Sequence, residues 1–352
     1  MTTSPLRRTR LVPLTAAALT ALALAAAPLA PATAARPAPT VSVSAATREA
    51  PGGTVPAVVT VKDVPPGYTV KSMSGAPATT NEHRSVVSCD SGTWHNPVQG
   101  TTSRSCYLRL GPAGDYTMTG TAVLSKPGAR DLTVQGSHSR AIVSKGYRTP
   151  RAMSQAEITT IARCGNTSKD VWLTFDDGGS AAQIRSILAT LKKNDVKGRF
   201  FMNGTWRDKN PTLMREITSA GHLLGNHTYD HPSLEGVGDA ELRRQIDKGV
   251  KATTKPALLR PPYGAGSYNT RLTALARAQG CTVCRWTHDT SDWAGRTGAQ
   301  MVEALRYGNA STAPVEAGGV VLMHGTAKHT SGSLQAIIDT VRGKELSLER
   351  LR

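Results

Sequence analysis

The sequence predicts a small all-β sandwich followed by an α/β domain. Short β-type runs separated by Gly/Pro turns fill residues 36–145, and strand-like segments alternate with helix-like segments in residues 166–352. A length of 352 residues is also typical of two domains rather than one. We therefore expect a β-sandwich accessory domain over 36–145, a linker over 146–165 and an α/β domain over 166–352.

Residues 1–35 have the pattern of a cleaved secretory signal. Arginines at positions 7, 8 and 10 precede an Ala/Leu-rich stretch, and Ala32–Ala35 supplies the small residues of a cleavage site. An uncleaved anchor helix is the alternative, which the prolines at 13 and 28 disfavour. We expect a secreted, extracellular protein without a stable membrane span after cleavage, exported by either the general or the twin-arginine route.

The charge is basic throughout. The whole chain has 42 Lys and Arg against 25 Asp and Glu, a net charge of +17, and removing residues 1–35 with their three arginines leaves +14. In an exported protein, spread positive charge favours association with an anionic cell-wall polymer, and charge that serves only solubility is an equal alternative. No nucleic-acid-binding motif is present. The 39% of hydrophobic residues is enough for a core.

The first domain reads as seven short strands. Several of these runs alternate apolar and polar residues, and seven strands in about a hundred residues are typical of an immunoglobulin-like sandwich. The expected strands are residues 40–45, 55–61, 68–73, 85–89, 103–110, 116–124 and 131–134. Nothing in this part of the chain indicates catalysis.

The second domain reads as repeated strand and helix units, which build a parallel sheet or a (β/α) barrel. A proline at 211 and a glycine at 221 mark the start and end of one helix. The expected strands are residues 171–175, 198–202, 222–225, 257–259, 282–286 and 319–323. The expected helices are residues 181–193, 211–221, 239–250, 269–279, 298–307 and 333–342.

Five cysteines in an exported chain predict two disulfides and one free thiol. Cys89 and Cys106 pair within the first domain, and Cys164 pairs with either Cys281 or Cys284. A zinc ribbon would need a second Cys-x-x-Cys pair, which the sequence lacks, so the Cys281–Cys284 spacing favours a structural role.

Ionisable residues follow the predicted strands of the second domain. In a (β/α) barrel the carboxyl ends of the strands share one face, where active sites are assembled. The residues at those ends are Asp176, Asp177, His227, Arg260, Asp289 and His324.

These residue types form a coherent set for metal-assisted hydrolysis. His227 and His231 are four residues apart and can bind one divalent cation, with one carboxylate of Asp176 and Asp177 as the third ligand. The second carboxylate can then act as a base toward a bound water, and His324, on another strand, can act as a general acid.

Five segments in order resemble the motifs of the polysaccharide deacetylases, the NodB-homology family of carbohydrate esterases (family 4). The resemblance covers about residues 169–342, excludes the first domain, and implies a distorted, incomplete (β/α) barrel. The segments are Thr-Phe-Asp-Asp-Gly at 174–178, His-Thr-Tyr-Asp-His at 227–231, Arg-Pro-Pro-Tyr at 260–263, Asp-Thr-Ser-Asp-Trp at 289–293 and Leu-Met-His at 322–324.

The resemblance also implies a role for each motif residue. Asp176 is the general base. Asp177, His227 and His231 hold a divalent metal, usually zinc, with cobalt or a similar ion as the alternative.

The remaining motif residues position the reacting groups. His324 is the general acid, Arg260 orients Asp176, Tyr263 offers its backbone N–H to the oxyanion, and Asp289 holds His324. Trp293 and Leu322 line the acetyl pocket, with core packing as the alternative for each. For Asp292, helix capping and function are both open.

Two positions depart from the family pattern. Gly179 stands where the family often has proline, and Gly325 stands where aspartate is frequent. Neither change removes a ligand or a catalytic group, so an active enzyme is expected.

The expected function is removal of N-acetyl groups from a GlcNAc-containing polysaccharide, either peptidoglycan or a chitin-type glycan, by a monomeric, metal-dependent enzyme at or near the cell wall. Acetylxylan esterase activity is the nearest alternative. A non-catalytic protein that binds wall glycans is the alternative from a different class.

Overall fold

The computed structural model describes residues 37–45, 54–78, 86–109, 114–142 and 153–351. The chain divides into two units, Met1–Pro37 and Ala38–Arg352. The expected signal segment 1–35 lies outside the described residues. Within the described ranges, no helix is long and apolar enough to cross a membrane.

The described part of the first domain is all β. Its strands form two antiparallel sheets, one ordered β1-β2-β6-β4 with β5 also paired to β6, and the other ordered β3-β7-β8. The strands are β1 (Thr40–Ala45), β2 (Thr54–Lys62), β3 (Thr69–Ala78), β4 (Val86–Cys89), β5 (Trp94–Asn96), β6 (Thr101–Arg109), β7 (Gly114–Ser125) and β8 (Leu132–Ile142).

One hydrophobic core lies between these two sheets. Alternate residues of β2, among them Val55, Val59 and Val61, pack against Met118 of β7. Cys89 and Cys106 face each other in the β4–β6 register and form a disulfide, as expected. The assignment of this domain to the immunoglobulin-like sandwiches stays a prediction.

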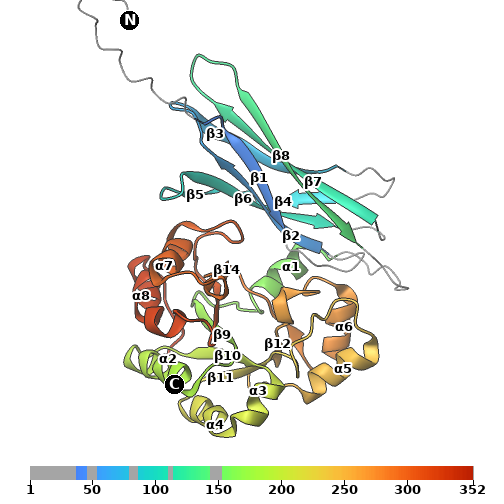
Figure 1. The fold of residues 1–352 in the computed structure, drawn as a ribbon, viewed down its shortest axis with the longest axis vertical. Coiled ribbons are helices and arrows are strands. Elements are labelled where there is room, and N and C mark those ends of the chain that lie inside the picture. Colours follow the sequence, from blue (N-terminus) through green and yellow to red (C-terminus); the bar gives the residue numbers. More distant parts are fainter. Residues whose placement is uncertain (1–36, 46–53, 79–85, 110–113, 143–152, 352) are drawn as a thin grey trace, which may run out of the picture. The chain divides into compact units, whose positions relative to one another are not determined.

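The second domain is built on a seven-stranded parallel sheet ordered β13-β12-β11-β10-β9-β15-β14, with helices around it (Figure 1). Its strands are β9 (Trp172–Asp177), β10 (Gly198–Met202), β11 (Leu223–Asn226), β12 (Leu258–Leu259), β13 (Thr282–Val283), β14 (His288–Asp289) and β15 (Val320–His324). Its helices are α1 (Gln155–Ala162), α2 (Ala181–Lys193), α3 (Gly204–Lys209), α4 (Pro211–Ser219), α5 (Asp239–Lys248), α6 (Thr270–Ala278), α7 (Gly298–Tyr307) and α8 (Thr330–Gly343), with short 3₁₀ turns η1 (Pro262–Gly264) and η2 (Asp292–Ala294).

The sheet is an incomplete barrel. Its two edges are β13 and β14, which follow each other in the chain but pair with β12 and β15 instead of with each other. The curled, open sheet agrees with the distorted (β/α) barrel that the sequence predicts.

Local sequence signals explain the well-defined elements. All five residues of β10 are buried, as expected for a strand in the middle of a parallel sheet, and the one charged side chain among them, Arg199, forms an ion pair with Glu349. Helix α2 begins with a capping box between Ser180 and Gln183, and its residues Ile184, Ile187 and Leu191 are buried against the sheet.

The structure selects Cys284 as the partner of Cys164, and Cys281 is free. The expected strand over 282–286 ends at Val283, so Cys284 lies just past the edge strand β13. The disulfide therefore joins the segment after α1 to the open edge of the barrel.

Candidate active site

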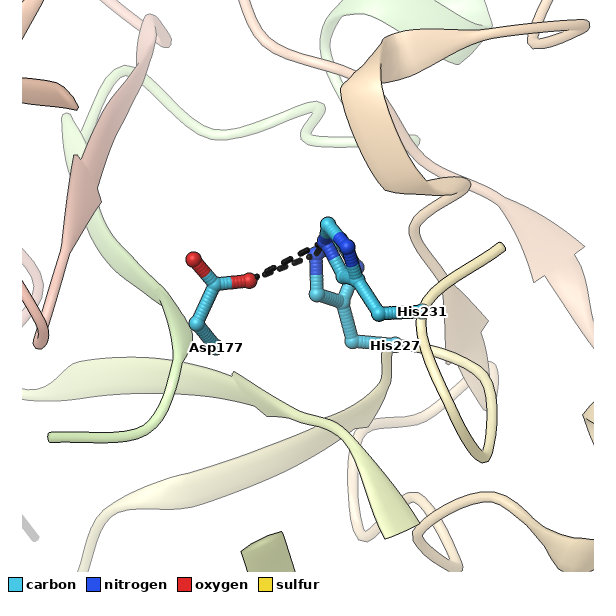
Figure 2. Close-up of side chains that lie close together, drawn as sticks. All are labelled: Asp177, His227 and His231. Atoms are coloured by element: carbon cyan, nitrogen blue, oxygen red, sulfur yellow. Dashed lines mark hydrogen bonds and ion pairs between the residues drawn. The ribbon is translucent and has the colours of Figure 1, made fainter. Parts of the chain in front are cut away.

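Three predicted metal ligands converge at the carboxyl ends of the strands. Asp177 ends β9, and His227 and His231 follow β11. One ligand atom from each lies within 4.8 Å of the others. His231 Nε2 is 3.1 Å from Asp177 Oδ1 and 3.2 Å from His227 Nε2, and Figure 2 shows the carboxylate facing both imidazoles.

The hydrogen bonds around this cluster favour a cation between the three residues. His227 Nδ1 lies 2.8 Å from the Arg260 carbonyl oxygen, which can only accept, so this nitrogen carries the proton and Nε2 presents a lone pair. That lone pair is 3.4 Å from Asp177 Oδ1, a buried atom without a hydrogen-bond partner.

The backbone adopts left-handed conformations at the residues that present these groups. Asp177, Thr228, His231 and Tyr263 have φ of 75°, 65°, 63° and 60°. Such conformations are unfavourable for residues other than glycine and cluster at functional sites. Here they turn the chain sharply after each strand, so that the side chains point into one cleft.

Asp176 forms an ion pair with a buried arginine, Arg260. The Asp176 carboxylate is 2% exposed, and its Oδ1 accepts a 2.7 Å hydrogen bond from Arg260 Nη1, which also donates to Thr174 Oγ1 at 2.8 Å. Arg260 is 0% exposed. Burial lowers the pKa of Arg260, and the adjacent Asp176 charge opposes this effect. The other oxygen of Asp176 lies 3.7 Å from His227 Nε2, so the carboxylate reaches the edge of the candidate metal-binding group.

His324 ends β15 and is paired with Asp292. Its Nδ1 is 2.8 Å from Asp292 Oδ1, and its backbone N–H donates to Asp292 Oδ2, which also accepts from the Thr330 hydroxyl. Burial lowers the pKa of His324, but the hydrogen bond and charge of Asp292, together with Asp176 and Asp177, raise it to about 9. The imidazole is therefore protonated at neutral pH, with Nε2 free to donate.

The partner of His324 differs from the expectation, which assigned this role to Asp289. The Asp289 carboxylate instead accepts hydrogen bonds from Ser291 N and Trp293 Nε1. Strand β14 ends at Asp289, and Ser291 at φ 55° turns the chain into η2, so Asp292 is the residue that reaches the end of β15. The two aspartates in the Asp-Thr-Ser-Asp-Trp segment were the only sequence signal, and their spacing does not say which one reaches His324.

The remaining predicted residues line the same cleft. Tyr263 is 68% exposed in η1, with its ring 4.8 Å from that of His231. Trp293 is 64% exposed, whereas Leu322 is 2% exposed and also belongs to the core. Nine of the ten predicted site residues line this cleft, and the tenth, Arg260, is buried beneath it.

Comparison with known proteins gives a family match over the first part of this site. The family model for polysaccharide deacetylase matches residues 164–284, which include the three candidate metal ligands, Asp176 and Arg260. Asp292 and His324 lie outside the match, so their assignment depends on the geometry.

Several of the curated relatives are named as glycan deacetylases. The chain is 36% identical over 174 residues to a peptidoglycan-N-acetylglucosamine deacetylase of Bacillus cereus, with 48% of this chain and 60% of that protein covered. It is 33% identical over 183 residues to the corresponding deacetylase of Listeria monocytogenes, with 51% and 37% covered.

These two alignments span less than two thirds of each relative. A chitooligosaccharide deacetylase of Sinorhizobium fredii is matched over 77% of its length, at 31% identity over 173 residues and 47% of this chain. The chain is thus a member of the polysaccharide deacetylase family.

Proposed function

We propose that the protein is a secreted, metal-dependent hydrolase that removes N-acetyl groups from GlcNAc residues of peptidoglycan or a chitin-type glycan. The observation that carries this proposal is the arrangement of three groups around one cleft: a two-histidine, one-carboxylate cluster, the Asp176–Arg260 pair, and the His324–Asp292 pair.

The donor set fits a divalent cation such as zinc. Two imidazoles and one carboxylate leave a coordination position open, as in catalytic zinc sites. When bound there, the metal supplies a water of lowered pKa and polarises the acetyl carbonyl. The proton on His227 Nδ1 is fixed by the Arg260 carbonyl, so Nε2 is the nitrogen that would be available to bind the metal.

The other side chains divide the proton transfers between them. Asp176 accepts the proton of the attacking water, and Arg260 fixes the direction of its carboxylate. The Tyr263 N–H donates to the oxygen of the acetyl carbonyl as negative charge develops on it. His324, charged through Asp292, donates its Nε2 proton to the leaving amine.

Glycan N-acetyl groups are the substrate that the relatives favour. The curated names of the matched proteins are peptidoglycan-N-acetylglucosamine deacetylase and chitooligosaccharide deacetylase. The net charge of +17, which the expected signal cleavage would reduce to +14, suits a monomer that works near an anionic wall polymer.

The test is acetate release by the zinc-loaded protein from GlcNAc oligomers, peptidoglycan and acetylated xylan, each with a chelated control. We expect chelator-sensitive release from the GlcNAc substrates only. Release from xylan alone would make the protein an O-acetyl esterase, and glycan pull-down without release from any substrate would favour the binding-protein alternative.

A further inference from the structure

The guanidinium of Arg260 lies between the Asp176 carboxylate and the Cys164–Cys284 disulfide. Arg260 Nη1 contacts Asp176, whereas Nη2 is 3.5 Å from Cys284 Sγ and 4.0 Å from Cys164 Sγ. Both cysteines are buried, at 1% and 0% exposure. The disulfide is therefore in direct contact with the group that orients the proposed base.

Arg260 has few polar partners for a fully buried cation. Besides Asp176 and Thr174, its acceptor is the Arg285 carbonyl oxygen, 2.8 Å from Nη2, while Nε has no partner. The face of the guanidinium lies 4.0 Å from the centre of the Phe201 ring. A buried charge depends strongly on each remaining hydrogen bond, so the position of the Arg285 carbonyl matters for the direction of Arg260.

The sheet supports that carbonyl through one neighbouring backbone hydrogen bond, from the Cys284 N–H to the Leu259 carbonyl of β12 at 2.8 Å. Arg285 lies two residues after β13, an edge strand of two residues at the open side of the barrel. Two connections to the segment around α1 hold it: the Arg285 N–H donates to the Ile161 carbonyl at 2.8 Å, and Cys284 is bonded to Cys164. In a closed barrel a neighbouring strand would provide this support.

We propose that the Cys164–Cys284 disulfide is a positioning element of the active site, which replaces the missing barrel closure and keeps Arg260 aligned on Asp176. Cys164 precedes β9, Cys284 follows β13, and neither belongs to the three candidate metal ligands, so the disulfide acts on turnover through Arg260 and leaves those ligands in place. This inference rests on the proposed deacetylase function.

The test is a double-mutant cycle between the disulfide and Arg260, with acetate release and bound zinc as readouts. We expect the paired variant Cys164→Ala/Cys284→Ala to lose about tenfold in kcat, the scale of one hydrogen bond to a charged group, with KM and zinc content unchanged. Arg260→Lys keeps the charge but loses the forked contact to Arg285, so removal of the disulfide in that background should cost less than about twofold.

Two control variants separate this role from a general effect of cysteine loss. Cys89→Ala/Cys106→Ala removes the other disulfide, and Cys281→Ala removes the free thiol. Both should retain the kcat of the unmodified enzyme. A kcat loss in Cys281→Ala as large as in the paired variant would point to a different pairing and overturn the proposal.

The remaining outcomes are also decisive. Equal losses in the wild-type and Arg260→Lys backgrounds, loss of zinc, or an unchanged kcat would each overturn the positioning role. If the alanine pair does not fold, Cys164→Val/Cys284→Ala fills more of the vacated volume, and failure of both pairs would assign the disulfide to folding alone. A wild-type protein that releases no acetate would contradict the proposed function itself, a result distinct from these.

Discussion

Two adjacent carboxylates, Asp176 and Asp177, differ in function because their neighbours differ. Asp176 points its Oδ1 at Arg260, whereas Asp177 Oδ1 faces His227 and His231 and has no donor. The left-handed backbone at Asp177 separates the directions of the two side chains. One carboxylate is therefore kept available for a proton and the other for a cation.

This division predicts that two isosteric variants both lose activity but differ in the zinc that they retain. Asp176→Asn should lower kcat by about 10²–10⁴-fold, because an amide cannot accept the proton of the water, while bound zinc stays near one equivalent. Asp177→Asn should lose zinc and activity together. Metal analysis alongside acetate release checks both, and zinc loss in Asp176→Asn would move that residue into the ligand set.

The His324–Asp292 pair predicts the alkaline limit of activity. His324 acts in its protonated form, so activity should fall as the pH rises through the pKa of this group, about 9 in the protein. A cation bound by Asp177, His227 and His231 would offset the charge of Asp177. The alkaline fall in activity is therefore expected at or below pH 9. Asp292→Asn removes the hydrogen-bonded charge that raises the pKa of His324, so the alkaline fall in activity should move toward lower pH.

Asp289→Asn is the matched control, because the Asp289 carboxylate bonds to Ser291 and Trp293 instead of to His324. The measurement is kcat/KM against pH for both variants. If the alkaline fall in kcat/KM moves further in Asp289→Asn than in Asp292→Asn, Asp289 is the partner of His324.

At the scale of elements, the sequence predicts what short-range patterns encode. The buried run of β10 and the capping box of α2 lie at the expected positions. The strands β5 and β14 were missed because three or two residues are too short to show a period. They depend on pairing with distant strands, which no local pattern records.

The same distinction applies to the site. Strand ends predict where ionisable residues gather, and the cleft contains them. The choice between Asp289 and Asp292 depends on how the chain turns at Ser291, and the choice of Cys284 as the partner of Cys164 depends on how the barrel edge meets the segment after α1. Both are tertiary details that spacing leaves open.

The two departures from the family pattern, Gly179 and Gly325, lie where the loop after β9 contacts the loop after β15. A Cβ at Gly325 would be 1.8 Å from the Gly178 carbonyl oxygen, and a Cβ at Gly179 would be 2.5 Å from the Gly325 carbonyl oxygen. Gly179 also has φ of 152°, which proline cannot adopt. The loop after β9 and the loop after β15 therefore approach closely because all three positions are glycine.

This contact predicts that Gly325→Asp, which introduces the residue frequent in the family, lowers activity by tenfold or more. The aspartate side chain would push apart the loops that carry Asp177 and His324. Gly332→Ala in α8 is the matched control, because a Cβ there meets nothing within 4 Å and should leave activity unchanged. Acetate release and thermal unfolding distinguish the two, and full activity in Gly325→Asp would show that the loops separate without cost.

At the scale of the molecule, the site joins parts of the sheet that are far apart in sequence. Asp177 lies at the end of β9 in the middle of the sheet, while His227 and His231 lie in the segment after β11. Strand β10 lies between β9 and β11, so no sheet hydrogen bond joins these two strands directly. A cation held by all three residues thus connects loops that the backbone hydrogen bonds of the sheet do not join.

Metal binding should therefore raise the stability of the folded chain. At a free zinc concentration one hundred times Kd, linkage predicts about 2.7 kcal/mol, or roughly 5–10 °C in Tm for a domain of this size. His231→Ala should fold but lose this shift in Tm, because only two of the three ligands remain. His95 is exposed in β5, outside the ligand set, so His95→Ala should keep the shift. Thermal unfolding of the three proteins with zinc and with chelator measures the effect. A full zinc-dependent shift in His231→Ala would remove His231 from the ligand set and place the cation elsewhere.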